Sequence, residues 1–148
     1  MNMNTRVQLA VMMFLNFFVW GLWFVTMGTY LTKSSIAATD TQAGLAYGTQ
    51  ALGAIIAPFI MGLIADKYFP AQKLLGLIHL AGAGIMYFIY SQNNFDSFYS
   101  LLLIYMIIFM PTLALVNAIA LKQMQNPEKE FSLIRVWGTI GWIAAGIL

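Results

Sequence analysis

The sequence predicts an all-α membrane protein with four complete transmembrane helices and an incomplete fifth. Hydrophobic residues make up 61% of the 148 positions and charged residues only 8%, whereas soluble domains carry about a quarter charged residues. The apolar residues form runs of about 20, the length that crosses a bilayer as a helix. Short polar segments separate these runs. The predicted spans cover about residues 7–31, 43–65, 74–90, 98–121 and 132–148.

The first span is too long for the apolar core of a secretory signal peptide, so we expect it to be retained. Four of its residues recur every three or four positions and therefore share one helix face, which carries an amide and two indole rings: Asn16, Trp20, Trp23 and Met27. An asparagine that faces lipid is costly. This face therefore lines a cavity, in which Asn16 and Trp20 contact a substrate, or it packs against a neighbouring helix.

The second span ends in a turn that carries Gly62, Asp66 and Lys67. Gly62 permits close helix contact, and Asp66 can cap the next helix or pair with a basic group across the turn. The alternative is a solvated turn without a structural role.

The single histidine, His79, lies in the third span. It is either a proton relay or a hydrogen-bonded packing residue. One histidine without a second ligand predicts no metal site. The chain also lacks cysteine, a phosphate-binding glycine loop and a serine–histidine–acid set. The sequence therefore predicts neither an enzyme nor a cofactor.

The fourth span contains Pro111, Thr112 and Asn117. A proline in mid-membrane kinks the helix and frees a backbone carbonyl, which a neighbouring hydroxyl can partly satisfy. Kinked helices with polar groups often line transport sites. Asn117 is therefore a candidate substrate ligand, and the alternative is a static kink with Asn117 bonded to a neighbouring helix.

Arg135 in the fifth span is the only formally charged side chain within these apolar runs. It faces a wet cavity and holds a substrate oxygen or a carboxylate, or it extends to nearby lipid headgroups. Thr139 and Trp142 follow at four and seven residues, so all three share a helix face. A guanidinium, a hydroxyl and a large ring on one face suit a flat, polar ligand. Gly138 and Gly141 can instead serve close helix packing.

The short loops predict the orientation. Five basic residues fall on the side that holds the N-terminus, and only Lys33 falls on the other. The five are Arg6, Lys67, Lys73, Lys122 and Lys129. The positive-inside rule therefore predicts a cytoplasmic N-terminus. A formal net charge of +2 without a basic patch does not suggest nucleic acid as a partner.

Four stretches together resemble the nucleoside:proton symporter family of the major facilitator superfamily. They are FFVWGLW at 17–23, GLIADK at 62–67, MPTLALVN at 110–117 and IRVWGTIG at 134–141. The resemblance implies a transporter of two six-helix bundles, with the substrate at their interface and alternating access. It makes this chain part of the N-terminal bundle, about a third of a family member.

The resemblance also implies roles for three residues. Arg135 matches an arginine tied to proton coupling and substrate binding, and Thr139 and Trp142 match positions that contact the nucleoside. Trp142 stands where the better-known members carry phenylalanine. The acidic coupling residue belongs to the C-terminal bundle, which we expect to be a missing part of the same polypeptide.

The predicted function is therefore proton-coupled nucleoside uptake across a bacterial cytoplasmic membrane. We do not expect these residues to transport alone, because alternating access needs a second bundle. One alternative is a major facilitator carrier of another polar solute, such as a sugar. The other is a small helical membrane protein that acts by association through its glycine faces.

Overall fold

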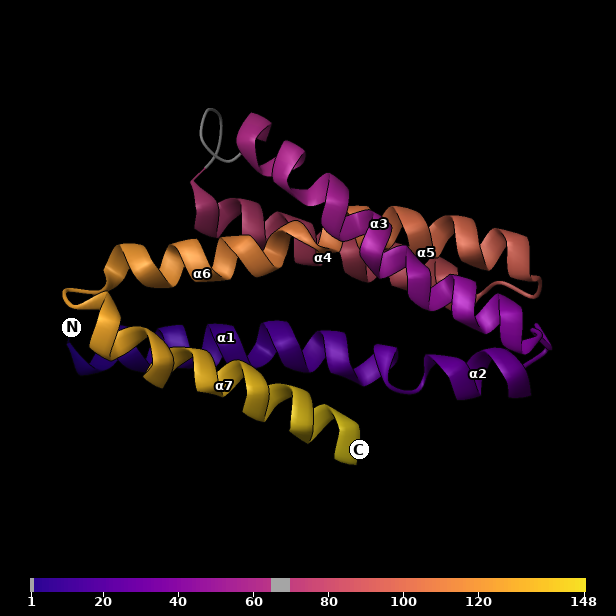
Figure 1. Cartoon of the computed structure of the whole chain (residues 1–148), viewed down its shortest axis with the longest axis horizontal. Helices are drawn as coiled ribbons and strands as arrows, with labels where there is room; N and C mark the ends of the chain where they lie inside the picture. The colour runs from indigo at the N-terminus through magenta and orange to yellow at the C-terminus, as the bar shows by residue number, and fades with distance from the viewer. Residues whose placement is uncertain (1, 65–69) are drawn as a thin grey trace. The chain divides into compact units, whose positions relative to one another are not determined.

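The computed structural model describes residues 2–64 and 70–148, and in this part of the chain every regular element is an α-helix (Figure 1). The all-α prediction is therefore confirmed. The helices are α1 (Met3–Phe24), α2 (Met27–Lys33), α3 (Asp40–Ile64), α4 (Ala71–Tyr90), α5 (Phe95–Phe109), α6 (Pro111–Gln123) and α7 (Pro127–Ile147). They form two compact units. The first unit comprises Met1–Met27 with Leu115–Leu148, and the second comprises Gly28–Ala114.

Three stretches of the described chain are long and apolar enough to cross a membrane. They are Met3–Lys33, Ala71–Tyr90 and Phe95–Gln123, and they coincide with the predicted first, third and fourth spans. The predicted second and fifth spans are also helical, as α3 and α7. The full set of five spans stays a prediction.

The first predicted span is interrupted, which the sequence did not predict. α1 ends at Phe24 and α2 begins at Met27. At the interruption the hydroxyl of Thr26 donates to the carbonyl oxygens of Leu22, at 3.2 Å, and Trp23, at 3.4 Å. Such bonds from a threonine hydroxyl compete with the backbone ladder and bend helices.

The fourth predicted span is interrupted where the sequence predicts it. α5 ends at Phe109 and α6 begins at Pro111. Proline has no backbone N–H, and its ring collides with the carbonyl four residues earlier, so the helical ladder cannot continue unchanged. Pro58, in contrast, lies inside α3, which continues past it.

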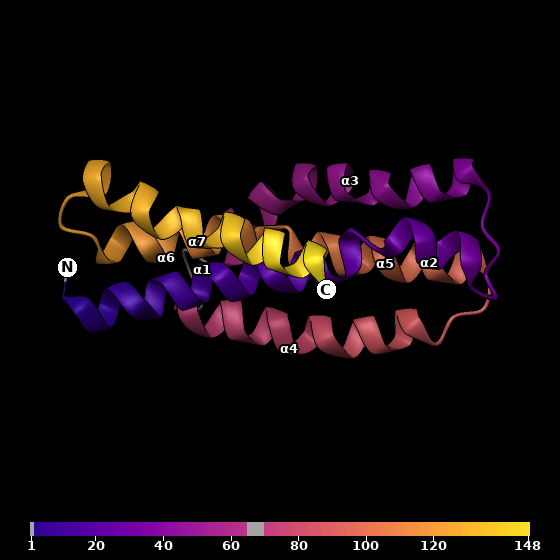
Figure 2. The same ribbon diagram turned by 90° about the horizontal axis from the view of Figure 1, so that it is seen from below.

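In the first unit, α1 and α7 run side by side in the same direction (Figures 1 and 2). A methyl group added to Gly141 would lie 3.0 Å from the carbonyl carbon of Phe14 and 3.1 Å from its Cα. One added to Gly21 would lie 2.8 Å from the Cβ of Ala145. Small residues thus bring the two backbones together, which is the packing role that the sequence left open for Gly141.

In the second unit, α5 packs against both α3 and α4, which lie on opposite sides of it in Figure 2. A methyl group on Gly53 of α3 would lie 2.6 Å from the carbonyl oxygen of Met106. One on Gly82 of α4 would lie 3.2 Å from the ring of Tyr105. Glycine therefore sets the closest approach at both contacts.

Side-chain caps fix where two helices of the second unit begin. Before α3, the N–H of Thr39 donates to Oε1 of Gln42 at 2.9 Å, and the N–H of Gln42 donates back to Oγ1 of Thr39 at 3.3 Å. This reciprocal pair is a capping box. Before α5, Oδ1 of Asn94 accepts from the N–H of Ser97 at 2.9 Å.

Candidate functional site

Arg135 lies against α1 in the first unit. The central carbon of its guanidinium is 4.3 Å from the ring centroid of Phe17, within the range of a cation–π interaction. The Arg135 side chain is half-buried, and Phe17 is buried. Gly138 borders the same contact, since a methyl group there would lie 2.8 Å from Nη1 of Arg135 and 2.7 Å from the Phe17 ring.

Trp142 also turns toward α1, where it meets two further rings. Its ring centroid is 4.8 Å from that of Trp20, with the planes at 75°, and 5.9 Å from that of Phe24. Trp20 in turn lies 6.2 Å from Phe17. We call these four rings, Phe17, Trp20, Phe24 and Trp142, the aromatic cluster. It joins Arg135 to Trp142 through residues of α1.

The other candidate residues lie in different environments. Asn16 is only 2% exposed and precedes Trp20 by one turn of α1. Thr139 lies on the exposed surface of α7, outside the cluster, although it shares a face with Arg135 in the helical pattern. Asn117 is half-buried on α6, and no described residue donates a hydrogen bond to its shielded side-chain oxygen. The structure thus unites Arg135, Trp20 and Trp142, but not Thr139.

Phe17 and Phe24 are not among the site residues that the sequence predicts. Both follow the spacing of three and four residues that singled out Trp20, so the signal was present in α1. Spacing alone does not distinguish them, because phenylalanine is an ordinary apolar residue in a membrane helix. Their role emerges only when α7 lies beside them.

Of the candidate structural motif, Gly62 lies near the end of α3. Asp66 and Lys67 fall outside the described residues.

The carboxylates of α7 lie in its first turn, ahead of the aromatic cluster. Glu130 accepts hydrogen bonds from the backbone N–H groups of Gln125, at 3.0 Å, and Asn126, at 3.2 Å. The Asn126 N–H holds the pKa of the Glu130 carboxyl below its ordinary value. The Glu130 carboxylate therefore caps the start of α7. Among the described residues, the structure places the Phe17 ring against the Arg135 guanidinium.

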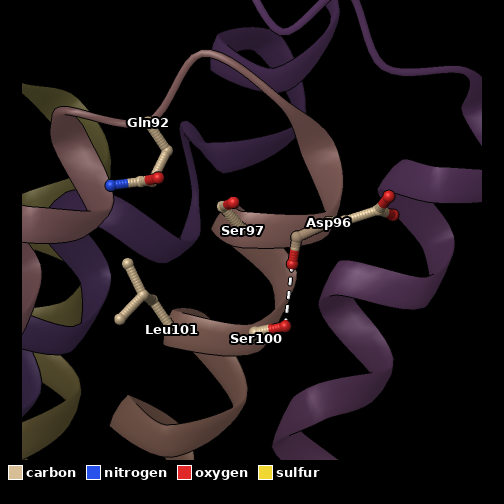
Figure 3. A pocket seen from close by; sticks show the side chains of 5 residues that line it. All are labelled: Gln92, Asp96, Ser97, Ser100 and Leu101. Carbon is tan, nitrogen blue, oxygen red and sulfur yellow. Dashed lines mark hydrogen bonds between the residues drawn. The ribbon is translucent and has the colours of Figure 1, made fainter.

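An open hollow of about 450 Å³ lies at the connection between α4 and α5, in the second unit (Figure 3). It is lined by Gln92, Asp96, Ser97, Ser100 and Leu101. The Ser100 hydroxyl donates to the carbonyl oxygen of Asp96 at 2.8 Å, and the Gln92 amide donates to that of Phe88 at 2.9 Å. These polar groups thus serve the helix ends, and the hollow contains none of the candidate residues.

The described residues contain no group of three His, Cys, Asp or Glu side chains that could hold a metal ion. The ring of His79 packs edge-on against Phe109, with the centroids 5.9 Å apart. Aromatic packing is thus one role that His79 has on α4.

Comparison with known proteins gives this geometry a context. The chain is 44% identical to the putative nucleoside transporter YegT of Escherichia coli K12, with 98% of the chain and 34% of that protein covered. It is 37% identical to the xanthosine permease and 31% identical to the nucleoside permease NupG of the same organism, each over 97% of the chain and 35% of the relative. The chain thus spans about a third of the length of these relatives.

The structure is similar to a crystal structure of the nucleoside transporter NupG. The TM-score is 0.90 at 31% sequence identity, with 97% of this chain and 36% of that one covered. The family model described as nucleoside H+ symporter matches residues 3–148. This protein belongs to the nucleoside H+ symporter family of membrane transporters.

Proposed function

We propose that this chain forms the N-terminal part of a proton-coupled nucleoside transporter of a bacterial cytoplasmic membrane. The family match over residues 3–148 carries this proposal. Relatives named as nucleoside permeases support it, as does the TM-score of 0.90 to the nucleoside transporter NupG. Since the chain spans about a third of those relatives, transport needs the remaining two thirds as the second body of an alternating-access machine. We assign no catalysed chemical conversion to this chain.

In this proposal the chain crosses the membrane five times. The spans are α1 with α2, α3, α4, α5 with α6, and the part of α7 from about residue 132 onward, so that Glu130 lies outside the membrane. α1 and α7 run in the same direction (Figures 1 and 2), so they enter the membrane from the same side. The first and fifth spans of a chain that crosses the membrane five times must do so. The excess of basic residues in the loops on that side makes it cytoplasmic. In the sequence, Gly62, Asp66 and Lys67 fall at the end of the second predicted span that this topology makes cytoplasmic.

The nucleoside binds beside the aromatic cluster. Trp142 stacks on the base, and Trp20, which meets Trp142 edge-on, forms the adjoining wall of the site. Thr139 lies on the exposed surface of α7 and hydrogen-bonds the ligand. Asn16 and Asn117 supply further amide groups from α1 and α6. An apolar site with a few polar groups suits a flat base attached to a hydroxylated sugar.

Arg135 couples the proton to the substrate. A fixed positive charge within a membrane helix is costly and needs a partner. We assign that partner to a carboxylate in the remaining two thirds of the transporter. When this carboxylate takes up a proton, it becomes neutral and its attraction to Arg135 weakens, so the two bundles can reorient.

The coupling role is tested by uridine uptake into proteoliposomes that contain the complete transporter, with and without an inward proton gradient. Arg135→Ala should abolish gradient-driven accumulation, whereas Val136→Ala, an exposed neighbour on α7, should leave it unchanged. Uptake by Arg135→Ala with its pH dependence intact would refute the coupling role.

The substrate class is tested separately by binding. Trp142→Ala should weaken uridine binding by about fivefold to 150-fold, since stacking on an aromatic side chain contributes about 1–3 kcal/mol per base. A complete transporter that binds a sugar and no nucleoside would overturn the proposed function.

A further inference from the structure

We propose that Phe17 and Gly138 are positioning residues for Arg135. The Phe17 ring holds the guanidinium against α1, and the missing side chain at Gly138 leaves the space in which it lies. This inference rests on the proposed coupling role of Arg135, which gives the position of its charge a function.

The first support is the contact between Arg135 and Phe17. The guanidinium carbon lies 4.3 Å from the ring centroid, well inside the distance of about 6 Å at which the ring face attracts a cation. Phe17 is only 8% exposed, so its ring is sheltered from competing solvent. Shelter strengthens an attraction between a charge and a ring quadrupole.

The second support is the direction in which the Arg135 side chain runs. Side chains in a helix tilt toward its N-terminus, and an arginine that reached for headgroups at the start of α7 would extend that way. Instead, Nη1 of Arg135 lies 2.8 Å from the place of a methyl group on Gly138, one turn toward the C-terminus. The side chain therefore points into the span and away from the nearer interface of the proposed topology.

The third support is the continuity of the rings. Phe17 lies 6.2 Å from Trp20, which lies 4.8 Å from Trp142. The ring that lies against Arg135 is thus packed against Trp20, one of the two rings to which we assign the base. A shift of Phe17 changes the place of the charge relative to the site of the base.

Fluorinated phenylalanines at position 17 test the ring contact, because each added fluorine weakens the ring quadrupole with little change in shape. The labelled protein is the purified 148-residue chain, whose arginines are Arg6 and Arg135. With Arg6→Lys, phenylglyoxal therefore has Arg135 as its one arginine target. The modification rate should rise stepwise from one to three fluorines, reaching about threefold to tenfold. The same series at Phe18, which stacks on Phe14 at 5.5 Å, should leave the rate unchanged. A flat series at position 17 would overturn the positioning role of Phe17.

Alanine at position 138 tests whether Gly138 leaves the space in which the Arg135 guanidinium lies. Gly138→Ala should displace the guanidinium and raise the phenylglyoxal rate of Arg135, because the new methyl group would lie 2.7 Å from the Phe17 ring and 2.8 Å from Nη1. Gly146→Ala is the matched control on α7, since nothing lies within 4 Å of a methyl group there. An unchanged rate in Gly138→Ala would show that Gly138 does not make the space.

Uridine uptake by the complete transporter separates this inference from the proposed function. Trifluorophenylalanine at position 17 should raise KM about threefold to tenfold and shift the pH profile of uptake, with the amount of inserted protein unchanged. If the labelling rate responds while Arg135→Ala transports normally, the coupling role fails and the positioning stands. If Arg135→Ala abolishes coupling while the labelling series is flat, the positioning is wrong and the proposed function stands.

Discussion

Replacing Gly141 by alanine should separate α1 from α7. The added methyl group would lie 3.0 Å from the carbonyl carbon of Phe14 and 3.1 Å from its Cα, and closer still to its carbonyl oxygen. Favourable contacts between carbon atoms lie at about 3.5–4.0 Å. The obstructing atoms are backbone atoms of a regular helix, so no side-chain rotation can relieve the contact. α1 must therefore move away by roughly half an ångström or more.

The cost follows from two opposing effects. Overpacking a close contact typically destabilises a protein by about 1–3 kcal/mol. Alanine is also a better helix former than glycine by about 1 kcal/mol, which offsets part of that cost. Gly146→Ala, on the same helix and free of any clash, isolates the second effect. We expect Gly141→Ala to be less stable than Gly146→Ala by about 1–3 kcal/mol.

The measurement is equilibrium unfolding of the purified chain in detergent micelles, followed by helical circular dichroism and tryptophan fluorescence. Trp20 and Trp142 lie 4.8 Å apart across the contact, so the emission spectrum reports directly on whether α1 and α7 remain together. Equal stability and identical emission in the two variants would refute the assignment of Gly141 as the point of closest backbone approach.

Three further predictions concern the second unit and the start of α7. Gly53→Ala should destabilise the chain by about 1–3 kcal/mol because its methyl group meets the α5 backbone at 2.6 Å, whereas Gly48→Ala on the same helix meets nothing within 4 Å; the same unfolding experiment compares them. Asn94→Ala should cost about 1 kcal/mol by removing the acceptor at the start of α5, and Asn94→Asp, which keeps an acceptor, should retain most of the stability. Glu130 has a lowered pKa, chiefly because the Asn126 N–H stabilises its charged form. The Glu130 carboxylate therefore stabilises the folded chain above pH 4.5, the ordinary pKa of the group. This stabilisation is lost as the pH falls through the lower pKa that the group has in the folded chain. In unfolding measured against pH, acid should destabilise the natural chain more than Glu130→Gln, and parallel profiles would contradict this assignment.

Much of the fold follows from local rules that a single sequence carries. The run length of apolar residues predicts the helices because the bilayer thickness fixes it. The interruption at Pro111 is predictable because proline cannot continue the backbone ladder. The interruption before α2 is not, since a threonine in a membrane helix bends it only where its hydroxyl bonds the preceding turn, as Thr26 does with Leu22 and Trp23.

The candidate site is only partly predictable for a related reason. Helical spacing alone places Arg135 and Trp142 on one face of α7, and Trp20 on a face of α1. Spacing does not reveal that the two faces meet, because more than a hundred residues separate them in the chain. The same rule also predicts Thr139 on the Arg135 face, yet Thr139 is exposed. A residue at the edge of a helix face can lie on either side of a contact, depending on where the neighbouring helix crosses.

The packing of the first unit and its candidate site are the same contact. Gly141 brings the backbone of α7 onto α1 at Phe14, and Gly138 leaves the space for the guanidinium over Phe17. Without these two glycines, α7 would stand farther from α1, and Arg135 would lose its ring. Gly138 and Gly141, for which the sequence offered close packing as an alternative to a site, therefore also shape the candidate site. Gly141→Ala should accordingly speed phenylglyoxal modification of Arg135 as well as lower stability, because a charge held by a neighbouring helix is released when that helix moves away.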